Sequence, residues 1–147
     1  MTNLILLTTG KLIQLAVTVN VYRLISPALD AYNAYAKATG GVLDEATGLL
    51  RITAEQYANL QPLTFVIGHS KYKLIANAQI LPRVFNVPLG GESDGIYLIV
   101  QNMSFSRQSG LSIVFGRPFL ERFYTVLDSG HRRVGFATTH FTEAETN

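Results

Sequence analysis

The chain contains no cysteine and no tryptophan among its 147 residues. Without cysteine it forms neither a disulfide framework nor a thiolate metal site, so the sequence favours neither an oxidising nor a reducing compartment. Charge is also sparse, because 12 basic and 10 acidic residues leave a net charge of +2. A surface this close to neutral does not favour nucleic acid or an anionic membrane as a partner.

Long apolar runs are missing as well. A membrane-spanning helix needs about 18 to 20 such residues, and the most apolar stretch near the start is interrupted by Thr8, Thr9, Lys11 and Gln14. This stretch also lacks the basic start of a signal peptide. We therefore expect no membrane span and no cleaved leader, and the sequence leaves the localisation unknown.

What the chain does contain is enough hydrophobic residues, 48% of the total, to build one domain with a buried core. The densest apolar segment spans residues 111–137. It starts with an apolar run that Gly116 closes, and Pro118 prevents a strand from continuing, so a short helical turn is expected over residues 119–122. Residues 123–137 then predict a β-hairpin around a polar turn.

Local patterns predict the remaining elements. A helix is expected to begin with Ser26 as its N-cap and Pro27 in its first position and to end near Gly40. A second helix should start after Thr53, with Gln56 completing a capping box. Strands are predicted over residues 4–7, 16–22, 49–52, 63–67, 72–75 and 96–100, a short helix or turn over 77–81, and loops over 84–94 and 102–110.

The segments VFG, FYTVLD and RVGFA, in this order, resemble the ending of pepsin-like aspartic proteases. The similarity continues upstream in AYAKATGGVLDEATGLLRITAEQYANLQPLTFVIG, ANAQILPR and YLIVQN, which are similar to acid proteases of basidiomycete fungi. It covers residues 24–147 and implies a mainly β fold, a single carboxyl-terminal lobe with two or three short helices. Residues 1–23 do not match, and they represent either an insertion or a replaced amino terminus of the same domain.

The catalytic motif that the resemblance implies is degenerate here. The family has two apolar residues followed by Asp-Thr-Gly and then Thr or Ser, whereas this chain has Thr8, Thr9, Gly10 and Lys11 after its two leucines. Pepsin-like enzymes hold a water between two carboxylates that share a proton, and a threonine hydroxyl cannot serve as that base.

The other aspartate of the family lies in an amino-terminal lobe that these 147 residues do not include. The resemblance therefore implies a truncated protease lobe, without catalytic residues and inactive alone. The alternative is a stand-alone binding or signalling protein that reuses the lobe as a scaffold.

The resemblance also suggests ligand positions. In the family, the loop equivalent to residues 102–110 lines pockets for a bound peptide, so Met103, Phe105 and Ile113 are candidates for contact with a peptide or protein ligand. Simple packing is the competing role for these apolar side chains. The run Val114, Phe115 and Gly116 implies a structural motif that passes behind residues 7–10.

The remaining motifs in the sequence do not predict a functional site. The triplet Asp128-Ser129-Gly130 spells a protease signature, but it is followed by His131 and lies in the predicted hairpin turn, where these residue types are expected for turn geometry. His69, His131 and His140 are too widely spaced for a metal motif, so no metal and no cofactor is predicted. Asn102 begins the single N-glycosylation sequon, which matters only in a secreted chain.

The predicted hairpin also carries an expectation about partners. In the family it joins a sheet shared by both lobes, so Phe123, Val126 and Phe136 would be left uncovered in this chain. We expect a two-fold homodimer, with the hairpin or residues 16–22 at the contact.

Overall fold

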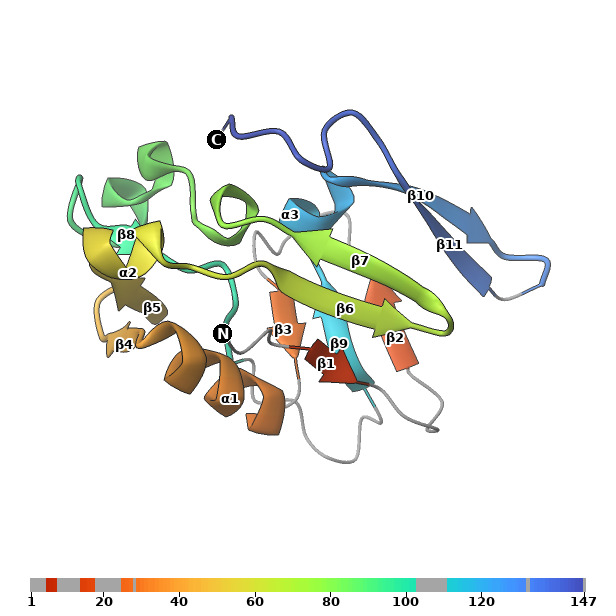
Figure 1. Ribbon diagram of the computed structural model, residues 1–147, viewed down its shortest axis with the longest axis horizontal. Helices are drawn as coiled ribbons and strands as arrows, with labels where there is room; N and C mark the ends of the chain where they lie inside the picture. The colour runs from red at the N-terminus through yellow and green to blue at the C-terminus, as the bar shows by residue number, and fades with distance from the viewer. Residues whose placement is uncertain are drawn as a thin grey trace.

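The structure, a computed structural model, describes residues 5–7, 14–17, 25–27, 29–102, 111–131 and 133–146. Within these ranges it contains eleven β-strands, three α-helices and three 3-10 helices (Figure 1). The expectation of a mainly β lobe with two or three short helices is confirmed. No helix in the described part of the chain is long and apolar enough to cross a membrane.

Four small sheets make up the β structure. The central one has the order β2-β9-β3, in which β2 (Gln14–Val17) runs parallel and β3 (Ile25–Pro27) antiparallel to β9 (Leu111–Phe115). The second places β1 (Ile5–Leu7) parallel to β6 (Leu63–Ile67), which forms a hairpin with β7 (Ser70–Leu74). The third is β4 (Val42–Asp44), β5 (Leu49–Ile52) and β8 (Ile96–Tyr97), and the fourth is the hairpin of β10 (Phe123–Asp128) and β11 (Arg133–Thr138).

The predicted start of the first helix is wrong. Helix α1 begins at Leu29 and ends at Thr39, whereas Ser26 and Pro27 belong to β3, where they pair with Val114 and Ile113. The pairing with β9 overrides the capping preference of Ser26. Proline is tolerated at this place because β3 is an edge strand of its sheet.

The second helix, α2 (Ala54–Ala58), starts as predicted. The Thr53 hydroxyl accepts from the Gln56 backbone N–H at 3.1 Å, and the Gln56 side chain accepts from the Thr53 N–H at 2.7 Å. The free amide nitrogen of Gln56 donates to the Gly40 carbonyl at 3.0 Å. One side chain thus caps α2 and ties it to the end of α1.

Several predicted boundaries need correction. The helical turn expected over residues 119–122 is α3 (Arg117–Leu120), which begins before Pro118 and not after it. Residues 84–94, expected to be a loop, contain part of one 3-10 helix (Arg83–Phe85) and the whole of another (Val87–Leu89), which Gly90 ends with φ 85°. The strand expected over residues 96–100 is only two residues long as β8, and Leu98 forms an isolated bridge with Ile80. The 3-10 helix at Asn77–Gln79 agrees with the prediction for that segment.

The core is one continuous cluster of buried residues that is built differently at its two ends. At one end, Leu49, Leu50, Ile52 and the run 96–100 are buried against Tyr35 of α1. At the other, aromatic rings from β6, β7, β9, α3 (Arg117–Leu120), β10 and β11 pack together. The β10–β11 hairpin leaves this second end and extends away from the rest of the chain (Figure 1).

Candidate functional site

Strand β9 carries the structural motif that the sequence singled out. Val114 and Phe115 are 3% and 1% exposed, and Gly116, which follows the strand, is buried too. Pairing on both sides makes β9 the middle strand of the central sheet. Buried strands that are paired on both edges are the most rigid support a site can have.

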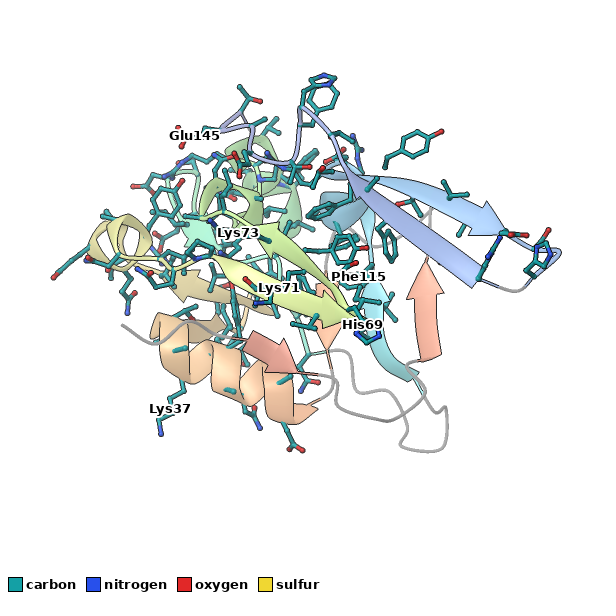
Figure 2. The ribbon with its side chains drawn as sticks, turned by 45° about the vertical axis from the view of Figure 1, so that its right-hand side comes forward. Lys37, His69, Lys71, Lys73, Phe115 and Glu145 are labelled. Carbon is teal, nitrogen blue, oxygen red and sulfur yellow. The ribbon has the colours of Figure 1, made fainter. Side chains whose placement is uncertain are left out.

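An aromatic cluster holds β9 in place. The Phe115 ring stacks on Phe119 of α3 at 3.9 Å and an interplanar angle of 16°, and Phe65 of β6 meets Phe115 edge to face at 5.0 Å. Helix α3 follows directly because the Gly116 carbonyl accepts from the Phe119 N–H at 3.1 Å. Figure 2 shows Phe115 inside this cluster, whereas Lys37 of α1 projects outward.

The predicted ligand residues are only partly described. Thr8, Thr9, Gly10, Met103 and Phe105 lie outside the described residues, and so does the turn behind which Val114, Phe115 and Gly116 were expected to pass. Strand β1 ends at Leu7, which pairs with Val66 of β6. The preceding residue of β6, Phe65, contacts Phe115. Ile113 is 8% exposed and joins the core, so a peptide contact through it stays a prediction.

All ten carboxyl side chains of the protein lie within the described residues, and none of them is buried. Glu92 is paired with Arg51, and Glu121 with Arg117 one helical turn away. The backbone N–H and then the hydroxyl of Thr47 bond to Asp44 and hold the pKa of its carboxyl below the ordinary value. No group of three or more acidic or histidine side chains in the described part of the chain has the arrangement of a metal site.

Asp128 is the last residue of β10 and pairs with Arg133, so the turn that the sequence predicted from Asp128 begins one residue later. Its carboxylate accepts from Arg133 Nε at 2.8 Å and from the His131 backbone N–H at 3.1 Å. These bonds, with Arg133 first, hold the pKa of the Asp128 carboxyl below its ordinary value. An aspartate at the end of a hairpin strand whose pKa is lowered is unsuited to the acid half of a proton-sharing pair.

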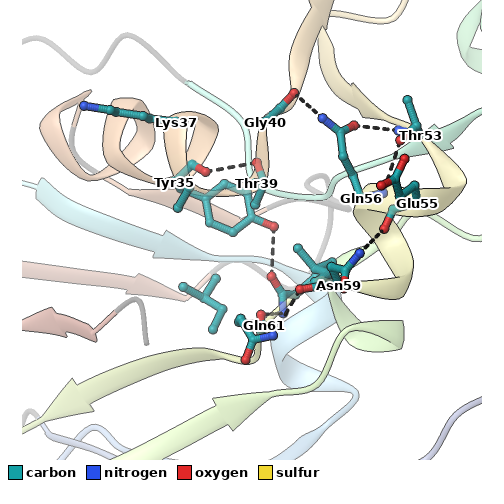
Figure 3. A pocket seen from close by; sticks show the side chains of 13 residues that line it. Tyr35, Lys37, Thr39, Gly40, Thr53, Glu55, Gln56, Asn59 and Gln61 are labelled. Atoms are coloured by element: carbon teal, nitrogen blue, oxygen red, sulfur yellow. Dashed lines mark hydrogen bonds between the residues drawn. The ribbon is translucent and has the colours of Figure 1, made fainter. Parts of the chain in front are cut away.

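A cavity of about 640 Å³ lies between the end of α1 and α2 (Figure 3). Its inner wall is polar and buried: the Tyr35 hydroxyl donates to Gln79 Oε1 at 3.0 Å, and Gln79 Nε2 donates to the carbonyls of Gln61 and Leu74 at 2.9 and 3.1 Å. Burial in this wall raises the pKa of the Tyr35 hydroxyl well above its ordinary value.

Most of these polar groups are hydrogen-bonded to one another. The Gln56 side chain likewise bonds to the Thr53 N–H and to the Gly40 carbonyl. The cavity is therefore chiefly a structural junction between α1, α2 and the segment after β7. Lys37 and Glu55, both exposed, are the charged residues that line it.

Sequence comparison identifies the protein family of this chain. The profile of the family described as "Eukaryotic aspartyl protease" matches residues 23–139. The chain belongs to this aspartyl protease family. It is 51% identical to polyporopepsin of Irpex lacteus over 120 residues, which are 82% of this chain and 35% of that protein, and 32% identical to human gastricsin over 107 residues, 72% of this chain and 25% of that protein.

Structural comparison agrees. The crystal structure of the aspartic proteinase from Irpex lacteus matches with a TM-score of 0.78 and 50% identity, covering 84% of this chain and 36% of that one. The chain thus has the fold of one part of an aspartyl protease and spans about a third of the length of polyporopepsin.

Two features of the site were not found from the sequence. The Tyr35–Gln79 wall joins residues 44 positions apart, and the stacking of Phe115 on Phe119 depends on the bend after Gly116. A signal for the first was present in the polar residue Gln79, which stands in a stretch from Ile75 to Leu81 that is apolar apart from Gln79 and Asn77. A buried glutamine must find partners for both ends of its amide, and here it finds them.

Proposed function

We propose that this chain is a pepsin-like aspartic protease lobe that does not hydrolyse peptide bonds as the 147-residue chain. The observation that carries the proposal is the state of the carboxyl groups. All ten are described, none is buried, and the two with clear pKa shifts are held as anions by hydrogen bonds. A protease dyad instead needs two close carboxylates, one of which retains a proton at working pH.

The degenerate motif supports the same proposal. Thr8 stands where the family's motif has its aspartate, and Lys11 stands where it has a small hydroxyl residue. A hydroxyl does not ionise in the acid range and cannot take a proton from the attacking water. The remaining framework of β9, Gly116 and α3 is intact, so the fold persists without the chemistry.

A direct assay tests this proposal. The purified chain should release no acid-soluble peptides from acid-denatured haemoglobin at any pH from about 3 to 7, the range in which a carboxylate pair acts. A pepsin-like enzyme in the same buffers serves as the positive control. Turnover that pepstatin inhibits would refute the proposal.

Replacing Thr8→Asp should not create activity, because a single carboxylate cannot divide the acid and base roles. A matched control is Thr9→Asp, which adds the same charge one residue away. Activity in Thr8→Asp but not in Thr9→Asp would mean that two copies combine their loops into one site, contrary to the expectation.

The second candidate function is a non-catalytic binding protein, and the polar cavity beside α1 and α2 is the feature that favours it. Mixing Thr8→Asp with the separately purified amino-terminal lobe of a related protease distinguishes the two functions. Restored hydrolysis favours a lobe that belongs to a protease, and failure with a correctly folded mixture favours a scaffold.

A further inference from the structure

The β10–β11 hairpin is a two-stranded sheet of its own. No other strand in the described part of the chain pairs with either of its strands. The expectation that Phe123 and Phe136 are left uncovered is wrong. Phe123 is 1% exposed, and the Phe136 ring packs against Phe119 at 5.2 Å and Tyr72 at 5.5 Å, so the base of the hairpin is anchored. Two-stranded hairpins are marginally stable alone, so the outer half gains from any further strand.

Apolar side chains lie on both faces of the hairpin, and Asp128 and Arg133 at its tip share one of these faces. Cross-strand pairing puts Leu127 and Val134 on one face, and Tyr124 and Val126 on the other. Tyr124, Val126 and Leu127 are 65%, 50% and 59% exposed. A surface hairpin usually has one polar face, so this pattern indicates a surface that is covered when the protein functions.

The direction of the backbone groups identifies the open edge. The Tyr72 hydroxyl donates to the Phe136 carbonyl at 3.2 Å, which places this carbonyl on the outer side of β11, toward β7. Because ladder bonds alternate in an antiparallel pair, Thr125, opposite Phe136, and Leu127, two residues on, direct their N–H and C=O groups outward from β10. The bond from Thr125 Oγ1 to the Phe123 carbonyl at 3.3 Å agrees with this direction.

This edge lacks the usual protection against pairing. Soluble proteins guard edge strands with charged residues, proline or a bulge. Residues 123–127, FYTVL, contain no charge and no proline, and their register with β11 is continuous. The charge that follows, Asp128, is already engaged by Arg133.

We propose that the β10 edges of two copies of this chain pair antiparallel about a two-fold axis and form a four-stranded sheet. A second copy fits because the edge is complementary to itself. Centred on Thr125, the pairing sets Tyr124 opposite Val126 of the second copy and brings Leu127 to the inner end of its β10, where Phe123 is buried, so that no like charges meet. The short edge covers less than the roughly 800 Å² per partner of a standard interface, so we expect a weak dimer that dissociates in the micromolar range.

Sedimentation equilibrium from about 1 to 300 µM tests the proposal over the concentration range that this affinity implies. The wild-type chain should pass from monomer to dimer. Leu127→Lys adds a charge to the open edge and should weaken the dimer at least tenfold, whereas Val42→Lys, a change at a 71% exposed position of β4, should leave it unchanged. Circular dichroism of both variants checks that they are folded.

Amide hydrogen exchange in the wild-type chain locates the contact independently of any substitution. The Thr125 and Leu127 amides should gain protection as the concentration rises, whereas the Val126 amide, already bonded within the hairpin, should not. A monomeric mass throughout the range overturns the proposal. So does a dimer that Leu127→Lys leaves intact, or one that forms without protection at Thr125 and Leu127.

Discussion

Arg122 connects the carboxyl-terminal segment to the rest of the lobe through hydrogen bonds, and replacing it should show how much these bonds stabilise the fold. Arg122 directly precedes β10, and the residue is buried. Its guanidinium donates to the carbonyls of Phe141 and Ala144 and to the Asn77 side-chain oxygen. The Arg122 carbonyl in turn accepts from the hydroxyl of Thr142 at 2.6 Å. Desolvation lowers the pKa of this guanidinium, which means that burying its charge costs free energy and offsets part of what its hydrogen bonds contribute.

The expected size of the effect follows from these opposing contributions. Each bond from a charged donor contributes about 1.5–3 kcal/mol, while burying the charge costs several kcal/mol and the freed carbonyls partly regain water. We therefore expect Arg122→Met, which keeps the length and loses the donors, to lower the free energy of unfolding by about 2–3 kcal/mol. In a chain of this size that lowers Tm by about 4–12 °C.

Urea unfolding followed by circular dichroism measures the loss, and hydrogen exchange over residues 139–146 locates it. Arg117→Met is the matched control, because Arg117 is exposed and paired with Glu121 within one helical turn, which is worth less than about 0.5 kcal/mol. Equal stability of Arg122→Met and Arg117→Met, with unchanged exchange at the carboxyl end, would refute the reasoning.

Three further outcomes are expected. Gly95→Ala puts a Cβ 2.5 Å from the buried Tyr97 ring and should destabilise by about 1–3 kcal/mol in urea unfolding; wild-type stability would contradict it. Tyr35→Phe leaves Gln79 Oε1 without its donor, which costs about 1–2 kcal/mol. It should also reduce the fall in stability expected above pH 10, where the unfolded tyrosine ionises and the buried one does not, and an unchanged fall would contradict this. Asp128, whose pKa is lowered, stabilises the fold above its ordinary value of 3.8, and this contribution is lost as pH falls through the lower folded value; the difference between wild type and Asp128→Asn should therefore shrink in acid, and a constant difference would count against it.

Local signals in the sequence were sufficient where neighbouring residues make the contacts. The capping box of Thr53 and Gln56 and the turn at Asp128 each involve residues within five positions, and both were predicted correctly. The same kind of reasoning wrongly predicted a helix start at Ser26 and Pro27. These residues pair instead with β9, a strand more than eighty positions away. The Tyr35–Gln79 wall was likewise beyond local patterns.

The parallel pairing of β2 with β9 has a consequence for how the chain acquires its structure. Ala16 pairs with Val114, so β2 leaves the ribosome about a hundred residues before its partner strand exists. The hairpin β6–β7 and the capped helix α2 involve near neighbours and are made before β9, so they can form during synthesis, but the central sheet must wait. We therefore expect closure of that sheet to be the slow step of folding, and β2 stays without its partner strand until residue 115 has been made.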